Sequence, residues 1–89
     1  MNPAEWLRRT AALMPTNPAL FRGENQVANY AEFANRAAAI AGALRARGIG
    51  KGSRVAVLMK NCTEYLEAMY GIWWSGAVAV PINAKLHEK

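Results

Sequence analysis

Cys62 and His87 are the two side chains in this sequence that could supply a thiol nucleophile and its base. No third residue is an evident orienting group for that imidazole, and one cysteine with one histidine supplies too few ligands for a closed zinc site. A lone cysteine at the start of a mostly apolar helix is more often a small buried hydrophobe. The sequence therefore predicts neither a nucleophilic centre nor a metal centre.

Glu64 and Glu67 stand three positions apart in a segment with helical periodicity, a spacing that two acid–base carboxylates could use. Structural roles explain them more simply. Glu64 falls in the first helical turn, where a negative charge interacts favourably with the helix dipole, and we expect Glu67 to face solvent on the one polar strip of the helix. We assign no catalytic role to either residue.

The segment 48–52 contains three glycines and invites comparison with nucleotide-binding loops. A Walker A loop needs glycine at the position of Arg45 and Ser or Thr at that of Gly52, and a dinucleotide fingerprint needs glycine at that of Ser53. Both loops also follow a strand and open a helix, whereas this segment follows a helix and opens a strand. The glycines therefore predict a helix-to-strand turn.

The N-terminal third predicts a short helix and a hairpin. The helix is expected over Pro3–Met14 because its apolar positions have amphipathic spacing, and two prolines follow it. Those apolar positions are Trp6, Leu7, Ala11 and Met14. Ala19–Phe21 and the residues from Val27 are expected to form two short strands around a turn at Gly23–Asn25.

A second, longer helix is predicted after Asn29, which with Glu32 has the spacing of a capping box. Apolar residues then recur every three or four positions and define one face of this helix. They are Tyr30, Phe33, Ala37, Ile40 and Leu44. Gly48 is expected to end the helix.

The C-terminal half predicts a strand, a helix and a strand. Arg54–Met59 is a short apolar run, Thr63–Ser75 is a helix that is apolar most of the way round, and Ala77–Ile82 is a second apolar strand that Pro81 would end or restrict to an edge. Such a βαβ unit has parallel strands. Adjacent tryptophans at 73 and 74 point about 100° apart on a helix, so we expect them to meet different neighbours.

These elements predict an α/β fold in which residues 1–89 form one incomplete subdomain: helix, hairpin, helix, strand, helix, strand. Parallel strands need cover on both faces, and this chain can barely provide it. The polar segment Lys85–Lys89 also follows a strand at a point where a doubly wound fold would continue. We therefore expect a partial doubly wound layer that packs against more protein.

Charge and composition argue against several classes of function and partner for this protein. Eleven Lys and Arg against six Glu give a net charge of +5, and the absence of Asp excludes aspartate metal sites and phosphoryl-transfer aspartates. The cations are spread over the whole length, which predicts a solvated basic surface and no nucleic-acid partner. A single cysteine allows no internal disulfide, so the cytoplasm is the expected compartment. The uncharged run Ala68–Ile82 is too short for a membrane span, and none is expected.

Three segments, in order, resemble the start of the AMP-forming adenylating superfamily, which includes the acyl-CoA synthetases. Asn29–Phe33 resembles an early core motif, with Asn29 in place of the usual Thr or Ser. Gly48–Met59 resembles a glycine turn and apolar strand, with Ser53 where Asp is common. Trp74–Asn83 resembles a second core motif of Gly-Ala, a short apolar strand and Pro, and is the most specific of the three.

Two further segments extend the resemblance, so that it covers nearly the whole chain from Pro3. Lys60–Cys62 with Glu64 resembles the loop and helix start between the core motifs, and Lys85–His87 resembles the fatty-acyl-CoA ligases. Members of the family activate a carboxylate with Mg-ATP to form an acyl-adenylate and pyrophosphate, and many transfer the acyl group to coenzyme A. The resemblance implies ATP, Mg and CoA as cofactors of an intact enzyme.

The family's phosphate loop, adenine- and Mg-binding segment, ribose-binding Asp and catalytic Lys all lie downstream of the matched segments. We therefore assign no catalytic, cofactor-binding or metal residue, and expect the isolated chain to be inactive. The positions shared with the family have scaffold roles: Gly48, Gly76, Pro81 and Asn83. The expected partner is the remainder of the synthetase domain, with self-association through apolar faces when that is absent. The alternative is a free-standing, basic protein-interaction module derived from this fold.

Overall fold

The computed structural model describes residues 2–59 and 63–83. Three helices and four strands follow one another as α1 (Pro3–Leu13), β1 (Pro18–Arg22), β2 (Asn25–Asn29), α2 (Tyr30–Ala46), β3 (Arg54–Met59), α3 (Thr63–Ser75) and β4 (Val78–Asn83). The order predicted from the sequence is confirmed. Cys62 and the segment Lys85–Lys89 lie outside the described residues.

Local sequence signals set the ends of the first two helices. The Asn2 side chain caps α1 by accepting from the Ala4 amide, with proline in the first helical position. The predicted capping box of α2 is present: Asn29 Oδ1 accepts from the Glu32 amide and Glu32 Oε1 accepts from the Asn29 amide, both at 2.8 Å. Between these helices, β1 and β2 pair antiparallel around Gly23, whose φ is 63°.

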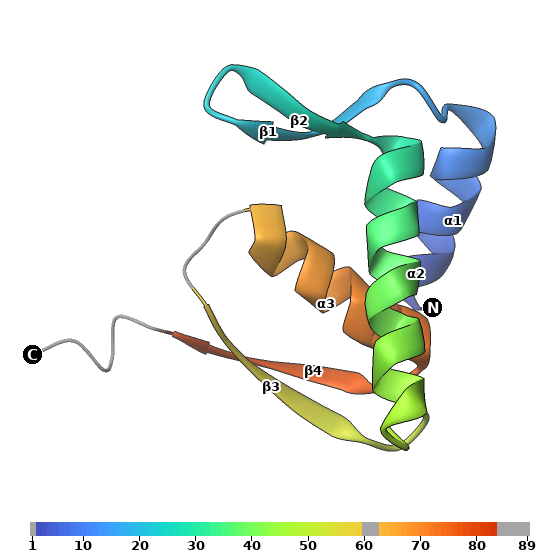
Figure 1. Cartoon of the computed structure of the whole chain (residues 1–89), viewed down its shortest axis with the longest axis vertical. Coiled ribbons are helices and arrows are strands. Elements are labelled where there is room, and N and C mark those ends of the chain that lie inside the picture. The colour runs from blue at the N-terminus through green and yellow to red at the C-terminus, as the bar shows by residue number, and fades with distance from the viewer. Residues whose placement is uncertain (1, 60–62, 84–89) are drawn as a thin grey trace, which may run out of the picture.

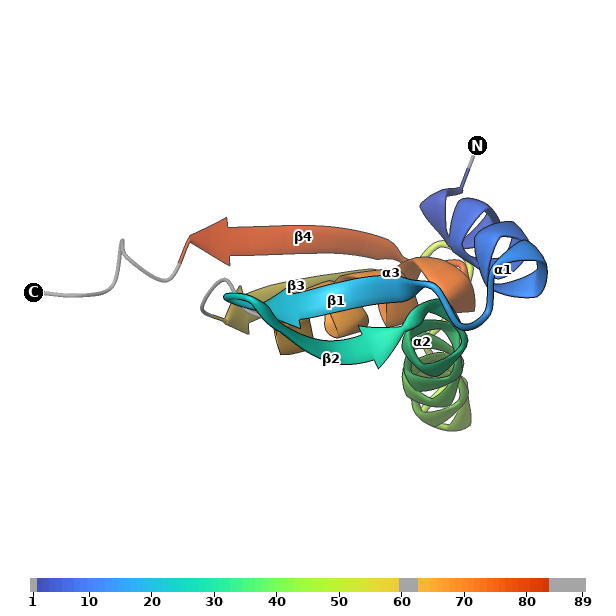
Figure 2. The ribbon, with the colours of Figure 1, turned by 90° about the horizontal axis from the view of Figure 1, so that it is seen from above.

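Helix α3 lies at the centre of the arrangement, between the β1–β2 hairpin and the β3–β4 pair, and α2 crosses it (Figure 1). Helix α1 contacts both α2 and α3. Seen from above, the hairpin lies over α3 and β3, while β4 runs along one side (Figure 2). Helix α3, which is apolar most of the way round, is therefore covered on more than one side.

Strands β3 and β4 are parallel, in register from Arg54 opposite Val78 to Met59 opposite Asn83. Pro81 lies within β4, opposite Val57, and the strand continues past it. Among the described residues β4 pairs with β3 alone, so Pro81, which has no backbone N–H, lies in an edge strand, one of the two predicted outcomes.

Two clusters form the core. One joins α1, the hairpin and α2, and its buried members are Leu7, Leu20, Ala28, Phe33, Ala34 and Ala37. The other joins α3 to one face of the β3–β4 pair, and its buried members are Val57, Met69, Ile72 and Ala77. Helix α3 belongs to both, since Tyr70 and Trp74 pack on the first cluster.

Helix α1 buries fewer of its large apolar side chains than its spacing suggests. Leu7 is fully buried, but Trp6 and Met14 are 47% and 43% exposed, and the helix ends at Leu13, one residue earlier than predicted. The small residues Ala4 and Thr10 lie beside Leu7 in the interface instead. Two of the three buried positions of α1 therefore carry short side chains.

Candidate functional site

Helices α2 and α3 approach each other closely where they cross at Gly71. A β-carbon at this position would lie 2.5 Å from Ile40 Cγ2, 2.6 Å from Ile40 Cβ and 3.2 Å from the Ala37 carbonyl oxygen. Ala37 and Ala41 are both fully buried in the same contact face of α2. Small residues on both helices therefore let the two backbones approach closely and fix the crossing that all other elements pack around.

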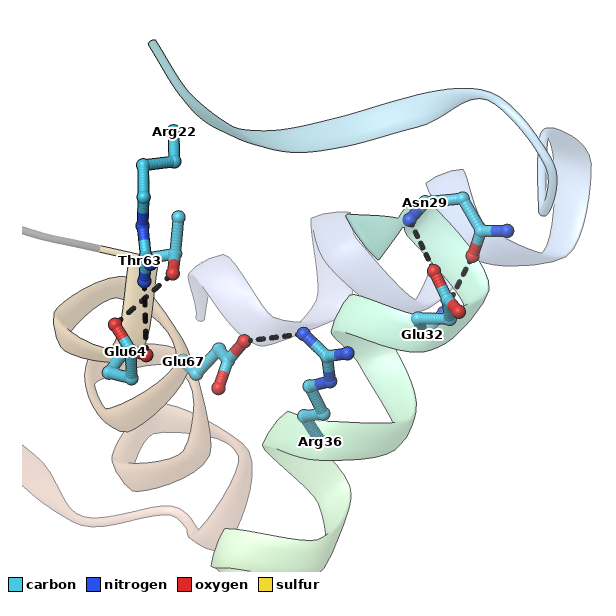
Figure 3. A network of polar contacts seen from close by, with 7 residues as sticks. All are labelled: Arg22, Asn29, Glu32, Arg36, Thr63, Glu64 and Glu67. Carbon is cyan, nitrogen blue, oxygen red and sulfur yellow. Dashed lines mark hydrogen bonds and ion pairs between the residues drawn. The ribbon is translucent and has the colours of Figure 1, made fainter. Parts of the chain in front are cut away.

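At one margin of this crossing, Arg36 of α2 forms an ion pair with Glu67 of α3 (Figure 3). Arg36 Nη1 donates to Glu67 Oε2 at 2.9 Å. The Glu67 side chain is only 14% exposed, because it is turned toward α2. The prediction that Glu67 faces solvent is therefore wrong: its strip of α3 is polar because it meets an arginine on the crossing helix.

Glu64 is oriented differently. Its carboxylate accepts from Thr63 Oγ1 at 3.2 Å and lies 3.5 Å from Arg22 Nη2 of β1, with both partners of the ion pair largely exposed. Figure 3 shows Glu64 directed toward the hairpin and Glu67 toward α2. Each carboxylate thus has its own arginine, and the two do not form a shared acid–base site.

An aromatic cluster fills the junction of the three helices around Tyr70. Its ring meets Phe33 and Trp73 edge-to-face with centroids 5.1 Å and 5.0 Å away, and Trp6 at 6.4 Å. Trp6 in turn meets Tyr30 at 6.0 Å. Burial raises the pKa of the Tyr70 phenol, and the nearby Tyr30 raises it further. The cluster is a packing unit shared by the three helices.

The two adjacent tryptophans meet different neighbours, as predicted. Trp73 packs with the sheet-side cluster, whereas Trp74 packs with the cluster around Leu7. The Arg8 guanidinium lies 5.5 Å from the centroid of Trp74, a cation–π geometry. Arg45 Nη2 donates to the Trp74 carbonyl at 3.0 Å. The end of α3 is thereby tied to both α1 and α2.

The glycine segment 48–52 is a helix-to-strand turn, as predicted. Gly48 closes α2 with φ of 81°, and Gly52 has φ of 89°, conformations that other residues rarely adopt. The Ser53 amide donates to the Gly50 carbonyl at 2.9 Å and the Gly50 amide donates to Ser53 Oγ at 3.2 Å. These amides are used within the turn, so they form no phosphate cradle.

No ligand cluster is found in the described part of the chain. Residues 2–59 and 63–83 contain no group of three or more His, Cys, Asp or Glu side chains close enough to hold a metal ion. They also contain no helix with the length and apolar character to cross a membrane. The pairing of Cys62 with His87 involves only residues outside that description.

The cavity of interest is an apolar groove of about 250 Å³ between α2, α3 and β3. The residues that line it are all aliphatic: Ile40, Leu44, Val55, Ala56, Val57, Ala68 and Ile72. A groove with an almost wholly apolar lining offers few hydrogen-bonding partners for a nucleotide. Its chemistry suits an apolar side chain of a neighbouring protein segment.

A family model described as "AMP-binding enzyme" matches residues 7–89. This chain belongs to the AMP-binding enzyme family. The resemblance drawn from Asn29–Phe33, Gly48–Met59 and Trp74–Asn83 is therefore confirmed, and so is the fold class. The shared glycines have backbone roles in this structure, since Gly76 has a φ of 93° between α3 and β4, as Gly48 does after α2.

The relatives of this AMP-binding chain include CoA synthetases and ligases, and also a phenyloxazoline synthase and a hybrid PKS-NRPS synthetase. A feruloyl-CoA synthase from Amycolatopsis is 40% identical over 81 residues, which are 91% of this chain and 16% of that protein. The N-terminal domain of FACL13 from Mycobacterium tuberculosis superposes with a TM-score of 0.86 at 40% identity, covering 96% of this chain and 22% of that one.

A third relative has been solved with nucleotide. The O-succinylbenzoate coenzyme A synthetase MenE from Bacillus subtilis, in complex with ATP and magnesium ion, gives a TM-score of 0.83 at 32% identity, over 90% of this chain and 22% of that one. This AMP-binding chain thus spans about a fifth or less of the relatives that it matches.

Sequence reasoning missed two features of the α2–α3 crossing, a close backbone approach and an ion pair. Gly71 interrupts an apolar helical pattern, and an isolated glycine in such a pattern signals a close backbone approach. The pairing of Arg36 with Glu67 had no such signal, because the residues are far apart in sequence and only the crossing angle of the helices brings them together.

Proposed function

We propose that residues 1–89 are the N-terminal scaffold layer of an ATP-dependent acid–CoA ligase, which converts a carboxylate, ATP and CoA into an acyl-CoA, AMP and pyrophosphate. Support comes from membership of the AMP-binding enzyme family and from relatives named as CoA synthetases and ligases. The names of these relatives span aromatic and aliphatic acids, so the proposal is restricted to the carboxylate class. The single cysteine makes the cytoplasm the proposed compartment.

The observation that carries the scaffold role is the uncovered face of the β3–β4 pair. Helix α3 covers the face with Val55 and Val57, but the opposite face presents Ala56, Val78 and Val80, with the two valines 53% and 40% exposed. Parallel strands occur almost only where both faces are covered. The missing cover is proposed to come from the remainder of the ligase domain.

The groove between α2, α3 and β3 is a second apolar surface of this layer. Its aliphatic lining continues the sheet-side core, since Val57 and Ile72 belong to both. Burying apolar area contributes about 25 cal/mol per Å², so filling the groove with an apolar side chain would stabilise the contact. We propose that the groove and the open sheet face together form the contact surface for the rest of the domain.

Catalysis is proposed to lie outside these 89 residues. The candidates for acid–base chemistry, Glu64 and Glu67, are each paired with an arginine and do not converge. ATP, Mg²⁺ and CoA are accordingly proposed to bind to other parts of the intact enzyme. In this proposal the role of the chain is to hold the layer against which those parts fold.

The test is an assay of the native polypeptide that carries this sequence, captured from its source with an antibody against residues 1–89. We expect AMP release that requires both an added carboxylate and CoA, across a panel of aromatic and fatty acids. The separately expressed chain is the matched control and is expected to release none. A native polypeptide without acid-dependent AMP release would contradict the ligase proposal.

A further inference from the structure

Strands β3 and β4 pair with each other, so among the described residues each has one edge that no other strand occupies. An unoccupied edge presents backbone N–H and C=O groups to which a further strand can bond. The two outer edges of this pair are not equivalent. The difference follows from which backbone groups are already used between β3 and β4.

The hydrogen bond from the Val78 amide to the Ser53 carbonyl, at 2.8 Å, sets the direction of the backbone groups along β4. Amides along a strand point alternately to its two edges. Val80 and Ile82 therefore direct their N–H groups toward β3, as Val78 does, whereas position 81 faces away from β3. The residue there is proline, which has no N–H. The outer edge of β4 thus lacks a donor midway along the strand.

The outer edge of β3 has no such gap. Arg54 stands opposite Val78, whose amide bonds toward β3. In a parallel pair the facing residue then directs its own backbone groups away, so those of Arg54, and in turn those of Ala56 and Leu58, point outward. The run from Val55 to Met59 contains no proline and no charged residue, the usual means of keeping an edge strand from pairing. Strand β3 has instead the apolar sequence of an interior strand of a parallel sheet.

The apolar groove lies beside the same edge of the sheet. It is lined by residues of α2, α3 and β3, and by none of β4. Seen from above, β4 lies on one side of β3 and α2 on the other (Figure 2). Side chains alternate between the two faces of a strand. A strand added to β3 would therefore direct every second side chain toward α3, into this groove.

We propose that a β-strand from the remainder of the ligase polypeptide adds to the outer edge of β3, with alternate apolar side chains in the groove between α2 and β3. Its backbone bonds to that of Arg54, Ala56 and Leu58, and the outer edge of β4 ends the sheet on the other side. This inference rests on the proposal that residues 1–89 are one layer of a larger ligase. It specifies which kind of element contacts the layer at this place.

A second copy of this chain is the competing occupant of the β3 edge. The chain matches only about a fifth or less of the length of its relatives, so an intact ligase has ample further polypeptide to supply a strand. A strand in the same polypeptide is present at a high effective concentration, whereas a second copy loses its translational freedom on binding. These two terms favour a strand of the same polypeptide.

The test is amide hydrogen exchange in the native polypeptide, resolved to single residues. We expect the amides of Ala56 and Leu58 to exchange at least about a hundredfold more slowly than that of Ala79, which faces the outer edge of β4. Acid-dependent AMP release by the same preparation reports separately on the ligase proposal. A preparation that releases AMP but exchanges the Ala56 amide as fast as the Ala79 amide would overturn the added strand alone.

Three variants of the native polypeptide test the edge independently of exchange. Ala56→Pro removes an outward donor from β3, so it should lower the melting temperature by about 5 °C or more. Ala56→Ser keeps the amide and is the matched control, and Pro81→Ala adds a donor to the outer edge of β4; both should melt close to the parent. The inference is overturned if Ala56→Pro melts as Ala56→Ser does, or if protection of the Ala56 amide appears only as protein concentration is raised, which would identify a second copy. If Ala56→Pro does not fold, exchange in the parent decides.

Discussion

Gly71 on α3 lies so close to Ile40 on α2 that no side chain fits between them: a β-carbon at position 71 would stand 2.5 Å from Ile40 Cγ2. This contact sets the distance between the two helices that support the rest of the fold. The aromatic cluster, the Arg36–Glu67 ion pair and the apolar groove all depend on it, because each is formed by side chains from both α2 and α3.

Gly71→Ala should therefore destabilise the protein although alanine is the better helix former. Overpacking typically lowers the free energy of unfolding by about 1–3 kcal/mol, whereas the higher helix propensity of alanine raises it by about 1 kcal/mol. The close approach to two Ile40 carbons places the overpacking cost toward the upper end, so we expect a net loss of about 1–2 kcal/mol in the free energy of unfolding, measured by urea denaturation.

The control is Gly42→Ala on α2, where an added β-carbon meets nothing within 4 Å. This variant should be neutral or more stable by up to about 1 kcal/mol. If Gly71→Ala raised stability as Gly42→Ala is expected to do, helix propensity would outweigh the α2–α3 contact and the account of the crossing would be contradicted. Combining Gly71→Ala with Ile40→Ala should restore part of the lost stability relative to Ile40→Ala alone.

The ion pair between Arg36 and Glu67 should contribute more than the one between Arg22 and Glu64. Glu67 is largely covered by the helix crossing, whereas Arg22 and Glu64 are both mostly exposed. Glu67→Gln is expected to cost about 1 kcal/mol and Glu64→Gln less than about 0.5 kcal/mol, by thermal or urea unfolding. Equal losses from the two variants would show that solvent screens both pairs alike.

Tyr70 gives a pH dependence of stability at the alkaline end. Because burial and then Tyr30 raise the pKa of the folded-state phenol above its ordinary value of 10.0, the folded state binds this proton more tightly than the unfolded state. The resulting stabilisation is fully present below about pH 10 and is lost as pH rises through the folded-state pKa. Unfolding measured between pH 9 and 11 should show this loss.

Tyr70→Phe should flatten that alkaline decline. Tyr65→Phe, which removes a phenol that packs on the other core cluster, is the matched control. The direction in which stability changes with pH distinguishes the possible outcomes. Stability that rises with pH above 10 in the parent protein, or an unchanged decline in Tyr70→Phe, would contradict the burial of the phenol.

The uncovered sheet face predicts the behaviour of residues 1–89 expressed alone. Val78 and Val80 are exposed on a face that we propose is covered in the intact enzyme, so the separate chain should self-associate. Sedimentation velocity should show species larger than 9.7 kDa, and replacing both valines with threonine should shift the distribution toward monomer. A cooperative, monodisperse monomer would contradict the idea that this face needs a partner.

Much of the fold can be predicted from local patterns in the sequence. The capping box of Asn29 and Glu32 fixes where α2 begins, and the apolar runs between glycines give β3 and α3 with their observed bounds. These features depend on residues a few positions apart, which is the range over which hydrogen bonding at helix ends and hydrophobic periodicity act.

The structure differs from the sequence-based predictions where elements that are distant in the sequence contact each other. Glu67 is covered because Arg36 approaches it from another helix, and Trp6 is left half exposed because Ala4 and Leu7 provide the closer contact. Leu66 of α3 is exposed for the same reason: tertiary packing selects which side of an almost wholly apolar helix is covered. Helical periodicity carries no information about the crossing partner.

The central claim is that this layer belongs to a larger ligase, and the size of the native polypeptide tests it most directly. An immunoblot of source cells with an antibody against residues 1–89 should detect a band several times heavier than 9.7 kDa. A band at 9.7 kDa itself would contradict the account, and the chain would then act by binding or assembly in its short form.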